Sequence, residues 1–139
     1  MRLEELQELA LRISSERDSA VVPRHIVEGL VQQPGVALAR LWILEPGDIC
    51  STCALRPDCT DQTACLHLAA SAGASLNGEA WSRIDGDFQR VPLGHRKVGG
   101  IAAANEGSLI SDPRSSAWAR PDWVRREGVV SFAGQPLVS

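Results

Sequence analysis

The chain opens with two helical patterns. Apolar residues recur three and four positions apart over 3–17, with charged side chains between them, which predicts an amphipathic helix. The same spacing over 23–33, stopped by Pro34 and Gly35, predicts a second helix. The seam of the first helix also fits a heptad repeat. It therefore predicts either packing on its own domain or pairing with a second copy in a homodimer.

Two apolar runs follow the helices. Residues 36–44 are apolar at nearly every position, which predicts a strand covered on both faces. A turn signal comes next, and residues 66–72 then predict a strand that ends at Gly73. We expect the two strands to be neighbours in an antiparallel pair, with the intervening segment as their connection.

The second half of the chain carries shorter signals. It predicts, in order, a polar loop, a strand, a short helix, a strand, another short helix and a final strand. The expected bounds are 74–87, 88–93, 101–105, 108–111, 121–127, and 129–132 continued by 136–138 with a bulge at Gly134. Gly99 and Gly100 precede the first of these helices, a position that can receive an anion. The whole predicts an α+β fold in one domain, 1–139.

Composition and charge narrow the possible functions. Hydrophobic residues make up 44% of the chain and charged residues 22%, which predicts a folded core and not a disordered chain. The net charge of -3 gives no general attraction to nucleic acid or to anionic membrane. The N-terminus lacks the apolar core of a secretory signal, and no stretch is long enough to span a membrane. These features predict a cytoplasmic protein.

All the cysteines lie in one short polar segment. Cys50, Cys53, Cys59 and Cys65 form the pattern C-x2-C-x5-C-x5-C. Four thiolates satisfy tetrahedral zinc and also hold iron–sulfur clusters, and the spacing leaves both open. Redox-active thiols or two disulfides are an alternative, which a reducing cytoplasm disfavours. A loop whose cysteines have no special role is the third possibility.

His67 follows the last cysteine by two positions. The period of two in a strand would put Cys65 and His67 on one face, where His67 could bind or tune the site. A half-buried strand histidine without such a role is the alternative.

Three stretches, in order, resemble parts of a GAF domain. They are Val-Ala-Leu-Ala-Arg-Leu-Trp-Ile-Leu with Leu-His-Leu-Ala-Ala-Ser-Ala-Gly, then Val-Gly-Gly-Ile-Ala-Ala-Ala-Asn-Glu-Gly with Ile-Ser-Asp-Pro, then Glu-Gly-Val-Val-Ser-Phe-Ala-Gly-Gln-Pro-Leu-Val. The resemblance covers nearly the whole chain. The Cys-rich insertion at 49–65 is similar to that of GAF domains in bacterial transcriptional activators and sensor kinases that carry a metal or iron–sulfur sensor. GAF domains continue with a further strand and a closing helix, so the expected fold is incomplete at its C-terminus.

The resemblance implies a PAS-related antiparallel sheet flanked by helices, with a small-molecule pocket between the sheet and its long connections. In this sequence the pocket would be bounded by Trp81, Phe88, His95 and Arg96, and by the helix expected at 101–105. His95 and Arg96 are candidates for binding an anionic ligand, and a solvated basic turn is their alternative.

The resemblance and the thiols together imply a sensory domain. It would detect redox state, oxygen, nitric oxide or a metal at the cysteine site and relay the change to an output domain of the same parent chain, a transcriptional regulator or a histidine kinase. One alternative is a small-molecule-binding module with structural zinc. Another is a GAF-like enzyme that reduces free methionine sulfoxide. Because the cysteines lie in a polar strand connection, without a Ser/His/Asp arrangement or an acid pair, we do not expect an enzyme.

Overall fold

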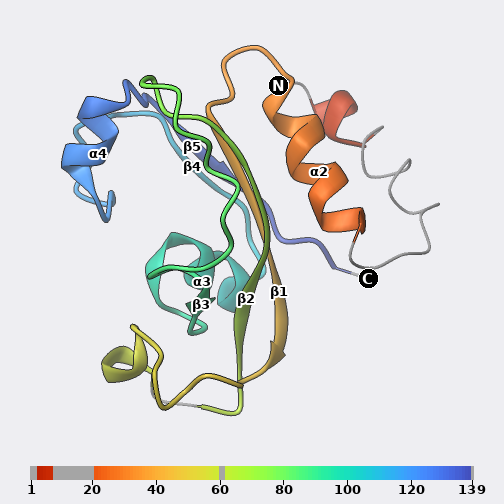
Figure 1. The fold of residues 1–139 in the computed structure, drawn as a ribbon, viewed down its shortest axis with the longest axis vertical. Coiled ribbons are helices and arrows are strands. Elements are labelled where there is room, and N and C mark those ends of the chain that lie inside the picture. Colours follow the sequence, from red (N-terminus) through yellow and green to blue (C-terminus); the bar gives the residue numbers. More distant parts are fainter. Residues whose placement is uncertain (1–2, 8–20, 60–61, 139) are drawn as a thin grey trace. The chain divides into compact units, whose positions relative to one another are not determined.

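The computed structural model describes residues 3–7, 21–59 and 62–138. Residues 3–7 are helical, and the rest of the helix expected at 3–17, with its dimer seam, lies outside the described residues. The other elements, in chain order, are α2 (Val21–Val31), β1 (Leu38–Pro46), a 3-10 helix η1 (Arg56–Asp58), β2 (Ala64–Gly73), β3 (Arg90–Val91), α3 (Arg96–Ala104), β4 (Ser108–Ile110), α4 (Pro121–Arg126) and β5 (Phe132–Gly134) (Figure 1). This confirms the predicted α+β class. Within the described ranges, no helix combines the length and the apolar composition needed to cross a bilayer.

The strands form two sheets. The first has the order β1-β2-β3, so β1 and β2 are neighbours as predicted. They run antiparallel, because Gly73 at the end of β2 contacts Ala37 just before β1, while the Gly47 amide after β1 donates to the Thr63 carbonyl before β2 at 3.0 Å. The second sheet pairs β4 with β5 in an antiparallel register that joins Leu109 to Ala133.

The contacts of the chain divide it into two compact units, the first formed by the described residues up to Ile43 together with His67–Gln89. The core of this unit is the contact between α2 and the small side chains of β1 and β2. Val27 of α2 is fully buried, and the other members are Ala39, Ala70 and Ala72 with Leu30, Val31 and Leu41 around them. The small alanine side chains on the strands let α2 approach closely, so the apolar face of this helix packs against the sheet.

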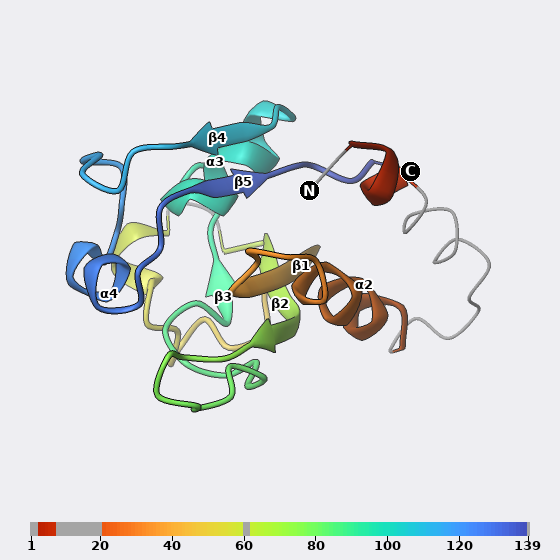
Figure 2. The same ribbon diagram turned by 90° about the horizontal axis from the view of Figure 1, so that it is seen from above.

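The second unit contains Leu44–Leu66 and the chain from Arg90 onward. Its core side chains come from β3, α3, α4, the loop before α4, the β1–β2 connection and the start of β2: Val91, Ile101, Val124, Trp118, Leu55 and Leu66. Within it, α3 lies against the β4–β5 ribbon (Figure 2). The ammonium of Lys97 stands over the rings of Trp118 and Phe132, at 5.1 and 5.6 Å from their centroids.

Several expectations from the sequence are wrong in detail. Gly99 and Gly100 lie inside α3, which begins at Arg96, so they do not form an anion-binding turn before a helix. Glycines are costly inside a helix, but Gly99 permits α3 to pack against the Pro92 carbonyl, where a side chain would not fit. The end of β1 is exposed and not covered on both faces, because an apolar run does not specify what packs on it. Gly134 pairs regularly with Ser108 and is not a bulge.

Candidate functional site

The connection between β1 and β2 folds into a series of tight turns. The Thr52 amide donates to the Ile49 carbonyl at 2.9 Å, and the Thr52 hydroxyl donates to the same oxygen. The Arg56 amide then donates to the Cys53 carbonyl at 3.2 Å, and η1 follows. Leu55 is the buried side chain of this segment, at 7% exposure. These bonds give a polar segment, rich in short side chains, a defined path without a core of its own.

All four cysteines line one pocket on this connection, which we call the thiol pocket. It encloses about 360 Å³, including the solvent space at its open mouth. Its walls are formed by Gly47, Asp48, Ile49, Cys50, Cys53, Arg56, Cys59, Gln62, Ala64, Cys65, Arg90 and Pro92. Every one of these residues belongs to the second unit, so the pocket is built within one compact body. Most of these residues belong to the connection that follows β1, drawn in yellow in Figure 1.

No disulfide joins the four cysteines, and each is partly buried. The Cys50 thiol points at the Gln62 carbonyl oxygen, 3.7 Å away. Among the described residues, no three His, Cys, Asp or Glu side chains stand close enough together to hold a metal ion without movement. The type and number of these side chains match a tetrathiolate ligand set. In this structure, however, the sulfur atoms are too far apart to coordinate one ion together.

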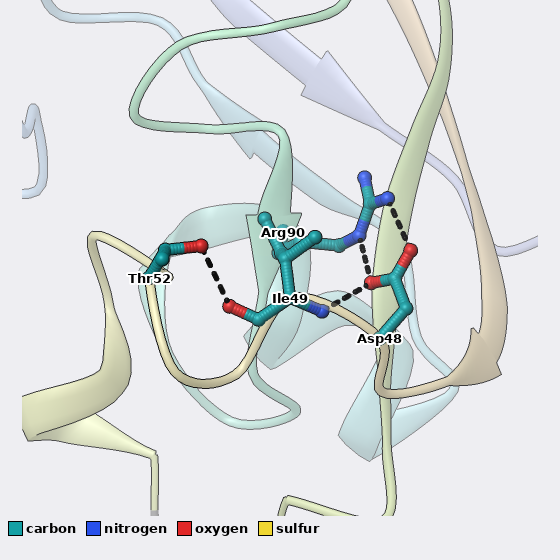
Figure 3. Close-up of polar contacts among 4 residues, drawn as sticks. All are labelled: Asp48, Ile49, Thr52 and Arg90. Carbon is teal, nitrogen blue, oxygen red and sulfur yellow. Dashed lines mark hydrogen bonds and ion pairs between the residues drawn. The ribbon is translucent and has the colours of Figure 1, made fainter.

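A bidentate ion pair forms one side of the pocket. Arg90, the first residue of β3, donates from Nε and Nη2 to the two carboxylate oxygens of Asp48 at 2.8 and 2.7 Å (Figure 3). The same carboxylate accepts the Ile49 amide at 2.9 Å. The Arg90 side chain is only 18% exposed and that of Asp48 is 48% exposed, so the pair is partly shielded from water.

The charges of the pocket act on one another. Burial raises the pKa of the Cys65 thiol, Arg90 opposes that shift, and Cys50, Cys53 and Asp48 add to it. The hydrogen bonds that Arg90 donates to the Asp48 carboxylate raise the pKa of Arg90, and Cys65 and Cys53 raise it further. Arg90 therefore lies within electrostatic reach of two thiols as well as of its carboxylate.

The other predicted site residues do not line the thiol pocket. His67 is a buried residue of β2, at 9% exposure, in the first unit. Trp81 and Phe88 also belong to the first unit, where the Phe88 carbonyl accepts the indole N–H of Trp42 at 3.0 Å. In the second unit, His95 is the N-cap residue of α3 and the exposed Arg96 is its first residue. The small-molecule pocket that the resemblance implies stays a prediction.

Asp48 and Arg90 were not predicted as site residues. Asp48 belongs to a turn signal and Arg90 to a short strand pattern. The residues next to each in sequence indicate only an ordinary surface charge. They are 42 positions apart, and only the pairing of β3 with β2 brings them together.

Comparisons with known proteins give this chain no relative. No protein-family model matches it, and neither a curated protein nor a solved structure is significantly similar to it.

Proposed function

We propose that this protein is a signal-sensing domain whose sensor is a zinc ion or an iron–sulfur cluster held by Cys50, Cys53, Cys59 and Cys65. The observation that carries the proposal is that all four side chains line one pocket. Four thiolates are the ligand set of tetrahedral zinc and of iron–sulfur clusters, and such centres respond to oxidants. The signal would be redox state, oxygen, nitric oxide or the metal itself.

Binding requires the thiols to close around the ion. They stand on turns and on the first residues of a strand, where rotation of the side chains and small loop movements bring sulfurs together. The burial that raises the pKa of Cys65 favours its protonated form when no cation is present. A bound cation reverses this preference, because metal ligands must be deprotonated. Movement of the connection would therefore accompany binding, which is the change that a sensor needs.

A chain of contacts in the second unit leads from the thiol pocket to α3. Arg90 joins the cysteine connection to β3, and β3 leads into Pro92, whose carbonyl packs against Gly99 of α3. Movement of the thiols toward a bound ion would be transmitted along these contacts to α3. We propose a GAF-like frame for it, because the order of helices, strands and cysteine insertion is the order on which the resemblance rests. The output would be a transcriptional regulator or a histidine kinase in the same parent chain.

Anaerobic purification followed by iron, sulfide and zinc analysis tests the proposal. We expect stoichiometric zinc or cluster in the wild-type protein, and its loss when Cys50, Cys53, Cys59 and Cys65 are each changed to Ser. His25→Ala is a matched control, since His25 is an exposed potential ligand on α2. A colourless, metal-free protein with four titratable thiols would remove the proposal. Bound zinc that never responds to oxidants would instead favour a small-molecule-binding module with structural zinc.

A further inference from the structure

Arg90 and Asp48 form an ion pair at the thiol pocket, and Arg90 is the less exposed of the two. Its side chain is 18% exposed, whereas that of Asp48 is 48% exposed and Arg56 is an exposed residue. The bidentate bond to Asp48 occupies Nε and Nη2 and fixes the plane of the guanidinium. Arg90 lines the same pocket as Cys53 and Cys65. The pocket therefore carries a positive charge of defined position beside its sulfur atoms.

The balance of charge along the walls is positive. Among the described residues that line the pocket, Arg56 and Arg90 are cationic and Asp48 is the carboxylate. Protonated thiols add no charge, so the described lining residues carry one net positive charge before the pocket binds anything. A ligand centre that brings negative charge would be stabilised here, and a neutral centre would gain nothing from Arg90.

Thiolate centres differ in this respect. A dication held by four thiolates carries two net negative charges, and so does an oxidised iron–sulfur cluster held by four thiolates. A trivalent ion such as arsenic(III), held by three thiolates, is neutral. The charge on the wall can therefore distinguish these classes even though all of them use the same sulfur atoms.

We propose that Arg90 is the charge-compensating residue of the thiol pocket and makes it selective for anionic tetrathiolate centres over neutral trithiolate ones. This inference rests on the proposed function and names the class of centre that the site takes. Asp48 positions the guanidinium, but its carboxylate lines the same pocket as the thiols, so its own negative charge opposes thiolate formation. The two members of one ion pair thus have opposite electrostatic effects on binding.

Titration of the reduced, metal-free full chain with cobalt(II) tests the inference, because thiolate-to-cobalt absorption reports tetrathiolate binding directly. We expect Arg90→Met to weaken cobalt binding about 10-fold, the scale on which residues behind metal ligands act. Arg90→Lys should stay close to wild type, since it keeps the charge. Asp48→Asn should bind cobalt at least as tightly as wild type.

The chain supplies a matched control. Arg83 and Asp85 form a second bidentate pair, at 2.9 Å from Nε, outside the lining of the pocket and with the arginine side chain 82% exposed. Arg83→Met removes the same chemistry and should leave cobalt affinity unchanged. A parallel titration with arsenite should give equal affinities for wild type and Arg90→Met, because a neutral centre needs no compensation.

Three results would overturn the inference. Equal losses of cobalt affinity in Arg90→Met and Asp48→Asn would show that the ion pair only stabilises the conformation of the β1–β2 connection. A loss in Arg90→Lys as large as in Arg90→Met would show that charge is not the cause. Equal weakening of arsenite and cobalt would remove the selectivity. If Arg90→Met does not fold by circular dichroism, the other two variants are compared with wild type: a clear loss of cobalt affinity in Asp48→Asn, or a loss of about 10-fold in Arg90→Lys, would overturn the inference. Wild-type protein that binds no cobalt would overturn the proposed function itself.

Discussion

The backbone of Gly47 packs against the sulfur of Cys50. A Cβ atom built on Gly47 would lie 2.9 Å from Cys50 Sγ and 2.6 Å from the Gln62 carbonyl oxygen. The Gln62 carbonyl is also the acceptor that the Cys50 thiol faces. Gly47 therefore leaves room for both the Cys50 sulfur and the Gln62 carbonyl, and its own amide donates to the Thr63 carbonyl at 3.0 Å.

Gly47→Ala is expected to displace Cys50 from the Gln62 carbonyl. The new methyl group meets backbone on one side, so the Cys50 side chain or the connection must shift, at a cost of about 1–3 kcal/mol in the free energy of unfolding. Cys50 should then be alkylated faster than in the wild-type protein, as measured by mass spectrometry of its peptide. Identical rates for Cys50 in the two proteins would show that the contact does not hold the thiol.

Two adjacent glycines of α3 should respond in opposite directions. Gly99→Ala drives a methyl group into the Pro92 carbonyl and should destabilise the protein by about 1–3 kcal/mol. A methyl group on Gly100 meets nothing within 4 Å, so Gly100→Ala should stabilise the helix by about 0.5–1 kcal/mol. Urea denaturation of the two variants measures both changes. Effects of the same sign would contradict the packing of α3 on the segment after β3.

The Cys65 thiol should titrate above an ordinary cysteine in the metal-free protein. Burial raises its pKa, and Arg90 alone among its neighbours lowers it, so Arg90→Met should raise it further. Because the folded pKa exceeds the unfolded one, the protonated thiol stabilises the fold below the unfolded pKa. This contribution is lost as the pH rises through the folded pKa. The pH dependence of alkylation at Cys65 checks the order; a midpoint at or below that of the denatured chain would contradict it.

Val27 should be a main contributor to the stability of the first unit. It is fully buried between α2 and the alanines of β1 and β2, so Val27→Ala loses two methyl groups and leaves a cavity. We expect a loss of about 2 kcal/mol in the free energy of unfolding. Leu76→Ala is the control, since Leu76 is 79% exposed and its truncation should change stability by less than about 0.5 kcal/mol. Equal effects would show that the α2 contact is not a core.

Local patterns were enough for the larger elements. The helix expected at 23–33 is α2, and the strand expected at 66–72 is β2, because periodic apolar residues and a Pro-Gly or glycine stop specify such elements without distant contacts. The short elements were harder. The strand expected at 88–93 is reduced to Arg90–Val91, and the helix expected at 101–105 begins five residues earlier. Their ends depend on what they pack against, such as Pro92 against Gly99, which no local pattern contains.

The sequence by itself determined the α+β class, the neighbouring strands and the presence of four thiols in one connection, because hydrophobic period, turn residues and cysteine spacing are local properties of the chain. Only the tertiary structure decided that Cys65 on β2 shares a pocket with Cys50, and that Arg90 and Asp48 form its charged wall. The reason is physical: a pocket and its electrostatics depend on distances across the sheet, and these are set by strand register and close packing among residues far apart in sequence.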